Sequence, residues 1–223
     1  MNPRQPTPAL DYKFTRDGQP CPFAGYTIIC SIVPDTPLSQ TASAFQAALR
    51  QQPWGSCFAL LPPSSFHMTV MDLLCDQIRT PERWSAHLPL DASLDTLATF
   101  FLDRVPPLPP SSHRTMHFHS IFHVDHLGLL LDPADSASDN DLRAYREAVS
   151  HATGVRAPDH TSYRFHMSMA YRLFALDEHE EAALAHLCTL WHPRFQAVGS
   201  QFTLPPPILA SFADLTCFVP VEK

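Results

Sequence analysis

The chain has 223 residues, of which 45% are hydrophobic and 17% are charged, a composition typical of one folded globular domain or of two smaller lobes. Its net charge of -7 argues against a protein that coats nucleic acid through phosphate contacts alone, because such binding depends on many cations. No apolar run approaches the ~18 residues that a membrane span requires, and the first six residues lack the hydrophobic core of a signal peptide.

The six cysteines are widely spaced, and no two of them form a C-x-x-C pair. In a chain without a secretory signal, this pattern is typical of reduced and mostly buried thiols. We therefore expect a cytoplasmic protein with no membrane association, and we expect it to act as a monomer.

The first half of the chain is expected to contain two strands and two helices. Residues 1–11 are predicted to be disordered, so that a single two-lobed domain covers residues 12–223. β-Branched side chains favour strands, whereas apolar residues that recur every three or four positions favour helices. On these grounds we expect strands at residues 26–33 and 66–74, and helices at residues 38–52 and 94–102.

A proline-rich run at residues 105–112 is incompatible with a helix or a central strand, and we expect the boundary between two lobes there. The second half repeats the order of elements seen in the first, which indicates an approximate internal duplication. We expect strands at residues 115–124, 127–131 and 162–173, a helix at 138–151 capped by Ser138 or Asp139, and a helix from Asp177 to about Trp191.

Two short segments match within this repeat: residues 66–71 read FHMTVM, and residues 165–170 read FHMSMA. Five H-x-[S/T] triplets occur in the chain, but only those at His67 and His166 share the same apolar frame on both sides. Because side chains alternate across a strand, each histidine and the hydroxyl two residues later project from one face, about 7 Å apart. An approximate two-fold relation between the halves would direct both pairs into one cleft.

Two imidazoles and two hydroxyls suit phosphodiester chemistry without a metal ion. An unperturbed imidazole titrates near pH ~6.5, so near neutrality one histidine can act as a base and the other as an acid. His67 and His166 are therefore the candidate catalytic residues, and the hydroxyls of Thr69 and Ser168 are candidate donors to phosphate oxygens. By strand parity Arg164 shares the face of His166, and we expect it to be a further phosphate contact.

These two motifs resemble those of the 2H phosphoesterase superfamily, which includes 2′,5′ RNA ligase-like proteins and cyclic nucleotide phosphodiesterases. The resemblance extends over residues 12–219 and is closest to an uncharacterised branch. It implies an α+β fold of two pseudo-symmetric lobes, each an antiparallel sheet with helices on its outer face, around a central cleft. It also implies acid and base roles for the two histidines and phosphate binding by the two hydroxyl residues. Tyr171, five residues after His166, stands where other members carry Arg or Tyr, and it is a further candidate for phosphate binding.

Other features bear on how a ligand is bound. With only six glycines the chain has no glycine-rich phosphate loop, which argues against an ATP-dependent enzyme. Four aromatic residues near the start either stack on a base at the rim of the cleft or pack in the core: Tyr12, Phe14, Phe23 and Tyr26.

The expected function is a metal-independent phosphodiesterase that needs no cofactor. It would open a 2′,3′-cyclic, related cyclic or 2′,5′ linkage of a nucleotide or short RNA end. Two alternatives stay open: a nucleotide-binding module without turnover, and a His-rich metal-binding protein. The latter depends on five histidines between residues 113 and 126, of which His117 and His119 would project side by side. The motifs also leave open which histidine is the base.

Overall fold

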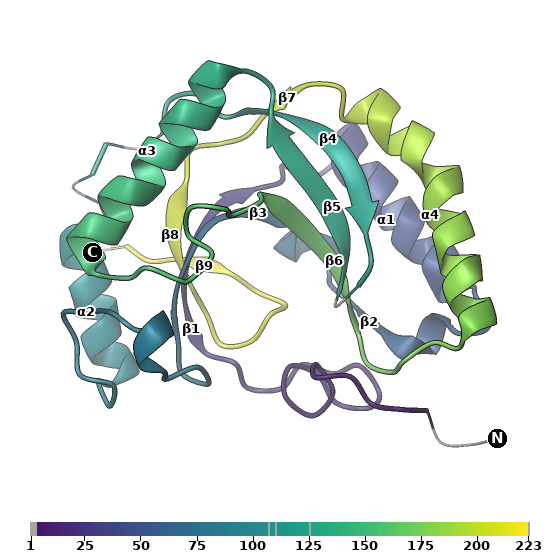
Figure 1. Ribbon diagram of the computed structural model, residues 1–223, viewed down its shortest axis with the longest axis horizontal. Coiled ribbons are helices and arrows are strands. Elements are labelled where there is room, and N and C mark those ends of the chain that lie inside the picture. Colours follow the sequence, from purple (N-terminus) through teal and green to yellow (C-terminus); the bar gives the residue numbers. More distant parts are fainter. Residues whose placement is uncertain (1–3, 107, 110, 125, 223) are drawn as a thin grey trace.

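The computed structural model describes residues 4–106, 108–109, 111–124 and 126–222, and within them the strands form one antiparallel sheet. The sheet is curled into a half-barrel with a pair of helices against each side (Figure 1). Its strand order is β7-β4-β5-β6-β3-β1-β8-β9, with β2 paired to β6. The strands are β1 (Gly25–Ser31), β2 (Phe58–Leu60), β3 (His67–Cys75), β4 (Thr115–Phe122), β5 (His126–Pro133), β6 (His166–Arg172), β7 (Phe202–Thr203), β8 (Ile208–Phe212) and β9 (Val219–Pro220).

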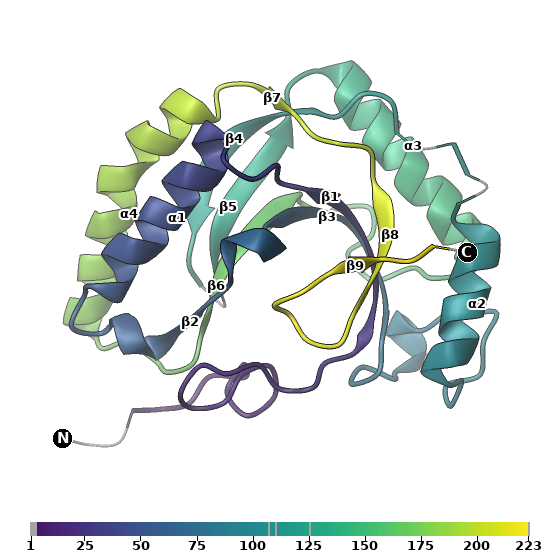
Figure 2. The same ribbon diagram turned by 180° about the vertical axis from the view of Figure 1, so that it is seen from behind.

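The helices cover the outer surface of the sheet in two pairs. α1 (Pro37–Arg50) lies against α4 (Glu178–Val198), and the ring of Phe45 is 5.4 Å from Trp191 and 5.7 Å from Phe195. α2 (Leu94–Arg104) and α3 (Ser136–Thr153) lie on the other side of the half-barrel (Figures 1 and 2). The predicted α+β fold with helices outside is therefore confirmed.

The two lobes do not coincide with the two halves of the sequence. α1 from the first half lies beside α4, whereas α3 from the second half lies with α2 (Figure 2). The C-terminal strand β8 pairs with β1, and β3 adjoins β6 at the centre, so the two expected sheets are joined into one. The run at residues 105–112 is therefore a connection between α2 and β4 rather than a border between lobes, and its residues 107 and 110 lie outside the described residues.

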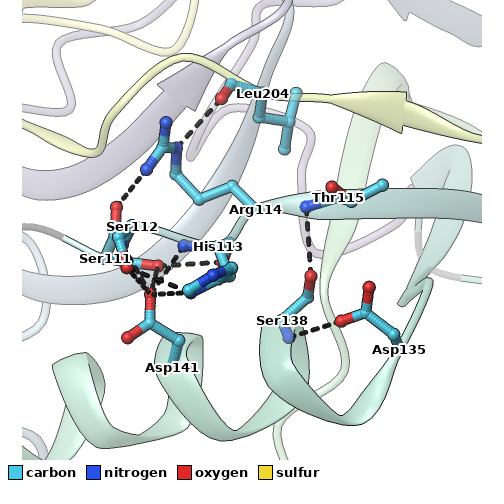
Figure 3. Close-up of polar contacts among 9 residues, drawn as sticks. All are labelled: Ser111, Ser112, His113, Arg114, Thr115, Asp135, Ser138, Asp141 and Leu204. Atoms are coloured by element: carbon cyan, nitrogen blue, oxygen red, sulfur yellow. Dashed lines mark hydrogen bonds and ion pairs between the residues drawn. The ribbon is translucent and has the colours of Figure 1, made fainter.

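This connection is fastened to α3 by a single carboxylate. Asp141 accepts hydrogen bonds from the Ser111 hydroxyl at 3.0 Å and from the backbone N–H groups of Ser112 and His113 (Figure 3). Arg114 donates to the carbonyl of Leu204 at 3.0 Å. The connection is thus held between α3 and the segment that leads to β8.

The predicted helices are present, but their ends differ, most clearly at the start of α3 and at the end of α4. α3 begins earlier than expected, because Asp135 rather than Ser138 or Asp139 is the N-cap and accepts from the Ser138 N–H at 2.7 Å. α4 begins after the predicted Asp177, whose side chain forms a capping box with Glu180. It continues past Trp191 and Pro193 to Val198, since the buried Phe195 packs against α1.

The N-terminal segment is ordered from residue 4, so the prediction of disorder is wrong for residues 4–11, while residues 1–3 lie outside the described part. The Thr7 N–H donates to Leu173 at 3.0 Å, and Arg4 forms a two-pronged ion pair with Glu180 at 2.6 Å. Leu10 is buried. Polar and proline-rich composition suggested disorder, but these contacts with the end of β6 and the start of α4 fix the segment. In the described part of the chain, the helices are all too short or too polar to cross a membrane.

Candidate active site

The two motif strands meet at the centre of the sheet. β3 and β6 are paired through Met68 and Met167, whose side chains are fully buried under the helices. The residues that precede them, His67 and His166, therefore point to the concave face. In antiparallel register they are diagonal neighbours, for which Cβ atoms lie roughly 7–8 Å apart.

Each histidine also faces a hydroxyl residue of the other strand. The Met68–Met167 pair sets His67 opposite Ser168, and it sets His166 opposite Thr69. Directly opposed Cβ atoms are about 5 Å apart. Each imidazole is thus close to the hydroxyl of the other motif as well as that of its own.

The two imidazoles are held in the same way. Nδ1 of His67 lies 2.7 Å from the carbonyl oxygen of Ser65, and Nδ1 of His166 lies 3.1 Å from that of Arg164. A carbonyl oxygen only accepts hydrogen bonds, so each Nδ1 carries the hydrogen. Nε2 is then the nitrogen available to a ligand in both rings.

A β-bulge in each motif strand brings one more residue to the same face. The register of β3 against β1 shifts at Val70, and that of β6 against β5 shifts at Met169. An extra residue reverses the alternation of side chains beyond it. The residue five positions after each motif histidine, Asp72 in β3 and Tyr171 in β6, therefore faces the concave side.

These residues line a cavity of about 320 Å³ inside the half-barrel. Five of the six residues predicted for the site are on its wall: His67, Thr69, His166, Ser168 and Tyr171. Among the described residues, the two motifs therefore converge on one space although they are far apart in the sequence.

The sixth predicted residue, Arg164, is not part of the cavity wall. Its side chain is exposed and its guanidinium lies 3.7 Å from Asp132. β6 begins only at His166, so strand alternation does not extend back to residue 164. Arg164 contributes its backbone carbonyl, which orients His166, and not a cation.

Asp72 is a cavity residue that the sequence did not single out. Its side chain is exposed to the cavity, and desolvation by the walls around it raises its pKa. The positive charges of His166, Arg146 and Lys13 oppose that rise. The signal for Asp72 was its place five residues after the first motif histidine, the counterpart of Tyr171 after the second.

His126 and Lys13 also reach the cavity. The His126 ring is 5.6 Å from His166 and stacks on Tyr171 at 5.5 Å, and burial lowers its pKa to about 4. Nε2 of His126 is buried and has no hydrogen-bond partner among the described residues. The Lys13 ammonium lies 4.7 Å above the Tyr171 ring. From the sequence, His126 was a candidate only for the His-rich metal-binding alternative, and Lys13 was not a candidate for the site.

The environment of His67 favours its neutral form. The Phe218 ring, from the loop between β8 and β9, lies 4.2 Å from the imidazole. Burial, together with the charge of His166, lowers the pKa of His67 to about 4, although the Ser65 carbonyl acts in the opposite direction. Burial likewise raises the pKa of Tyr171 to about 12, so its phenol remains a hydrogen-bond donor.

The four aromatic residues near the start of the chain were expected either to pack in the core or to lie at the cleft, and both placements occur. Phe14 is fully buried and packs 5.3 Å behind Tyr171, whereas Phe23 and Tyr26 line the cavity. Tyr12 is partly exposed and donates to the carbonyl of Gln77.

The histidines between residues 113 and 126 do not form a common site. His119 pairs with Asp132 at 2.8 Å, and His126 lies instead in the cavity. In the described ranges no group of three or more His, Cys, Asp or Glu side chains is arranged to hold a metal ion. The alternative of a His-rich metal-binding protein therefore has no supporting cluster of ligand side chains in this part of the chain.

Comparisons with known proteins identify the class. Residues 13–123, which contain the first motif, match the family described as "2H-phosphodiest: Domain of unknown function (DUF1868)". This match places the chain in the 2H phosphoesterase superfamily, as the resemblance of the two motifs predicts. Its membership indicates a phosphoesterase.

Solved structures agree with this fold. A conserved protein of unknown function from Agrobacterium tumefaciens str. C58 is 23% identical, with a TM-score of 0.90 over 98% of this chain and 93% of that chain. A protein described as a phosphoesterase is 9% identical, with a TM-score of 0.51 over 91% of this chain and 97% of that chain. Among curated proteins no sequence matches the chain.

Proposed function

We propose that the protein is a metal-independent phosphodiesterase that opens a 2′,3′-cyclic or related cyclic or 2′,5′ phosphodiester of a nucleotide or short RNA end. The observation that carries this proposal is the matched placement of His67 and His166. Both histidines line one cavity, and each donates from Nδ1 to a backbone carbonyl two residues earlier. Two oriented Nε2 atoms near one phosphorus supply a base and an acid on opposite sides of a displacement.

In this proposal His67 is the base and His166 the acid. With its pKa lowered to about 4, His67 is neutral near neutrality and accepts a proton from the attacking water or ribose hydroxyl. The oxygen so activated forms the new bond to phosphorus, and the P–O bond to the leaving oxygen breaks. His166 donates a proton from its imidazolium form to that oxygen.

The hydroxyls would bind the phosphate between the two rings. Thr69 and Ser168 lie opposite the histidines across the strand pair, so their donors reach the non-bridging oxygens from both sides. The phenol of Tyr171 is a third donor, and Lys13 over its ring adds a positive charge.

Replacement of each histidine tests the proposal. We expect His67→Ala and His166→Ala each to lower turnover of a nucleoside 2′,3′-cyclic phosphate by about 10²–10⁴-fold in EDTA. Product formation is followed by phosphorus NMR, and circular dichroism verifies that the variants fold. His186→Ala, at an exposed position on α4, is the matched control and should keep full activity.

Full activity of either active-site variant would contradict the mechanism. Binding of the cyclic phosphate by the unaltered protein without any product would also contradict it and favour the nucleotide-binding module. Activity that EDTA abolishes and added metal restores would exclude the metal-independent reaction.

A further inference from the structure

One arm of the cavity has features that acid–base chemistry does not use. Asp72 presents its carboxylate to the cavity, where its side chain is exposed. An ionised carboxylate at the wall of a cavity is available to accept hydrogen bonds from a ligand. The register of β3 places Asp72 opposite Thr27 of β1, and the charge of Asp72 also raises the pKa of Tyr171 in the same cavity.

The cavity wall on this side is largely aromatic, and the lining also includes the cation Arg83. Phe23, Tyr26, Phe212 and Phe218 line the cavity on the side of β1 and β8. Tyr26 is fixed by donation from its hydroxyl to the Leu94 carbonyl at 3.1 Å. Flat aromatic walls favour a planar ligand, and stacking of a base on such side chains stabilises binding irrespective of its sequence.

We propose that this arm is a nucleobase subsite in which Asp72 selects bases whose edge presents two adjacent N–H donors, as guanine does. The inference rests on the proposed function, which places the phosphate between the two histidines. A carboxylate has two acceptor oxygens and no donor when ionised, so it pairs with both the ring N–H and the exocyclic amine of guanine. Adenine presents an acceptor at the ring position and would leave one oxygen unsatisfied.

The position of Asp72 fits a base better than a ribose hydroxyl. Asp72 follows His67 by five residues, one of which is taken up by the bulge, so the two Cα atoms are about 13 Å apart along the strand. That separation matches a nucleoside extending from its phosphate, whereas a sugar hydroxyl lies close to the phosphorus. A cavity of about 320 Å³ is at the lower end of the size range for small-molecule sites, which suits one nucleotide.

The charges around Asp72 are consistent with an ionised acceptor. Burial raises its pKa, but His166, Arg146 and Lys13 supply opposing positive charge from β6, α3 and the N-terminal segment. Asp159 is the carboxylate that acts in the same direction as burial.

The test compares guanosine, inosine and adenosine 2′,3′-cyclic phosphates as substrates of the full chain. We expect kcat/KM to fall in the order guanosine, inosine, adenosine, with about 10- to 100-fold between the first and the last, the size expected for one bidentate contact to a base. Asp72→Asn should bring the guanosine to adenosine ratio close to one while the adenosine substrate is still opened. Asp103→Asn, the same change at an exposed site on α2, is the control and should preserve the ratio.

Equal kcat/KM values for the three substrates, or a ratio unchanged by Asp72→Asn, would overturn the subsite while the proposed function stands. A loss in Asp72→Asn that is equal for all bases would also overturn it, since that result assigns Asp72 to the chemistry. If no cyclic phosphate is opened, the proposed function fails, and dissociation constants of guanosine and adenosine 3′-monophosphates then decide. A guanosine preference lost in Asp72→Asn supports the subsite, and equal binding or none overturns it.

Discussion

The two histidines of the site have equivalent backbone contacts but different surroundings. His67 lies under the Phe218 ring, which excludes water from the imidazole, whereas His166 faces His126 and Phe122 at its edge. The backbone contacts therefore orient both rings alike, whereas the surroundings of His67 lower its pKa to about 4. A neutral His67 is what its proposed role as the base requires.

The pH dependence of kcat/KM tests the assignment of His67 as the base. A base must be unprotonated, so activity should be kept as pH falls until it approaches about 4, the lowered pKa of His67, and should decline tenfold per unit below it. If His67 were instead the acid, activity would require its protonated form and would already be lost above that value. Initial rates across the acid range distinguish the two, with circular dichroism at each pH to verify that the fold persists.

The face on which a site residue lies was predicted correctly where side chains alternate regularly along a strand, and wrongly where they do not. His67 and Thr69 are two residues apart, and parity placed them together correctly. The same parity misplaced Arg164, because the strand had not yet begun, and offered no reason to consider Asp72, because a bulge reverses the alternation before it. A bulge depends on the partner strand, so a single segment of sequence does not reveal it.

At the scale of elements, α3 supports the β3 bulge through a buried cation. Arg146 of α3 donates to the carbonyl of Val70, the bulged residue, and to that of His160 at 3.0 Å. Its guanidinium also lies 4.1 Å from the Tyr163 ring, and the Tyr163 hydroxyl donates to the Thr69 carbonyl. Helix and strand thus fix the backbone that directs Thr69 and Asp72 into the cavity.

Arg146→Met should therefore destabilise the fold and reduce activity. The change leaves the carbonyls of Val70 and His160 without their donor, and each unsatisfied buried group costs about 1–3 kcal/mol. The free energy of unfolding, measured by urea titration, should fall by about 2–4 kcal/mol.

Arg143→Met is the matched control on the same helix. Arg143 is partly exposed, and its surface ion pair with Asp139 contributes less than about 1 kcal/mol. Equal destabilisation by the two substitutions would contradict a specific role for Arg146 at the bulge.

The order of elements was predictable from sequence, but their pairing was not. Apolar spacing located α1 and α2, and β-branched content located β1. α1 and α3 lie on opposite sides of the half-barrel, and β8 pairs with β1. Both arrangements arise from tertiary packing between segments far apart in the chain. Local patterns also gave no signal for β2 and β7, which are only two or three residues long.

At the scale of the whole molecule, both ends of the chain close the cavity that the two motifs open. The N-terminal segment brings Lys13 over Tyr171, and the loop between β8 and β9 brings Leu215 and Phe218 to the opposite wall. Figure 2 shows this loop in front of the concave side of the sheet. The strands carry the two motif histidines, and the terminal segments supply further walls of the cavity around them.

Phe218→Ala tests whether the C-terminal loop sets the protonation of His67. Removal of the ring admits water to the imidazole, so we expect the His67 pKa to rise from about 4 toward the value of about 6.5 for a free imidazole. The shift is read by NMR titration of the imidazole proton, and the acid limb of kcat/KM should move upward with it. Val219→Ala, at an exposed neighbouring position, should leave both unchanged. An unaltered titration in Phe218→Ala would mean that the sheet alone, and not the closing loop, keeps His67 neutral.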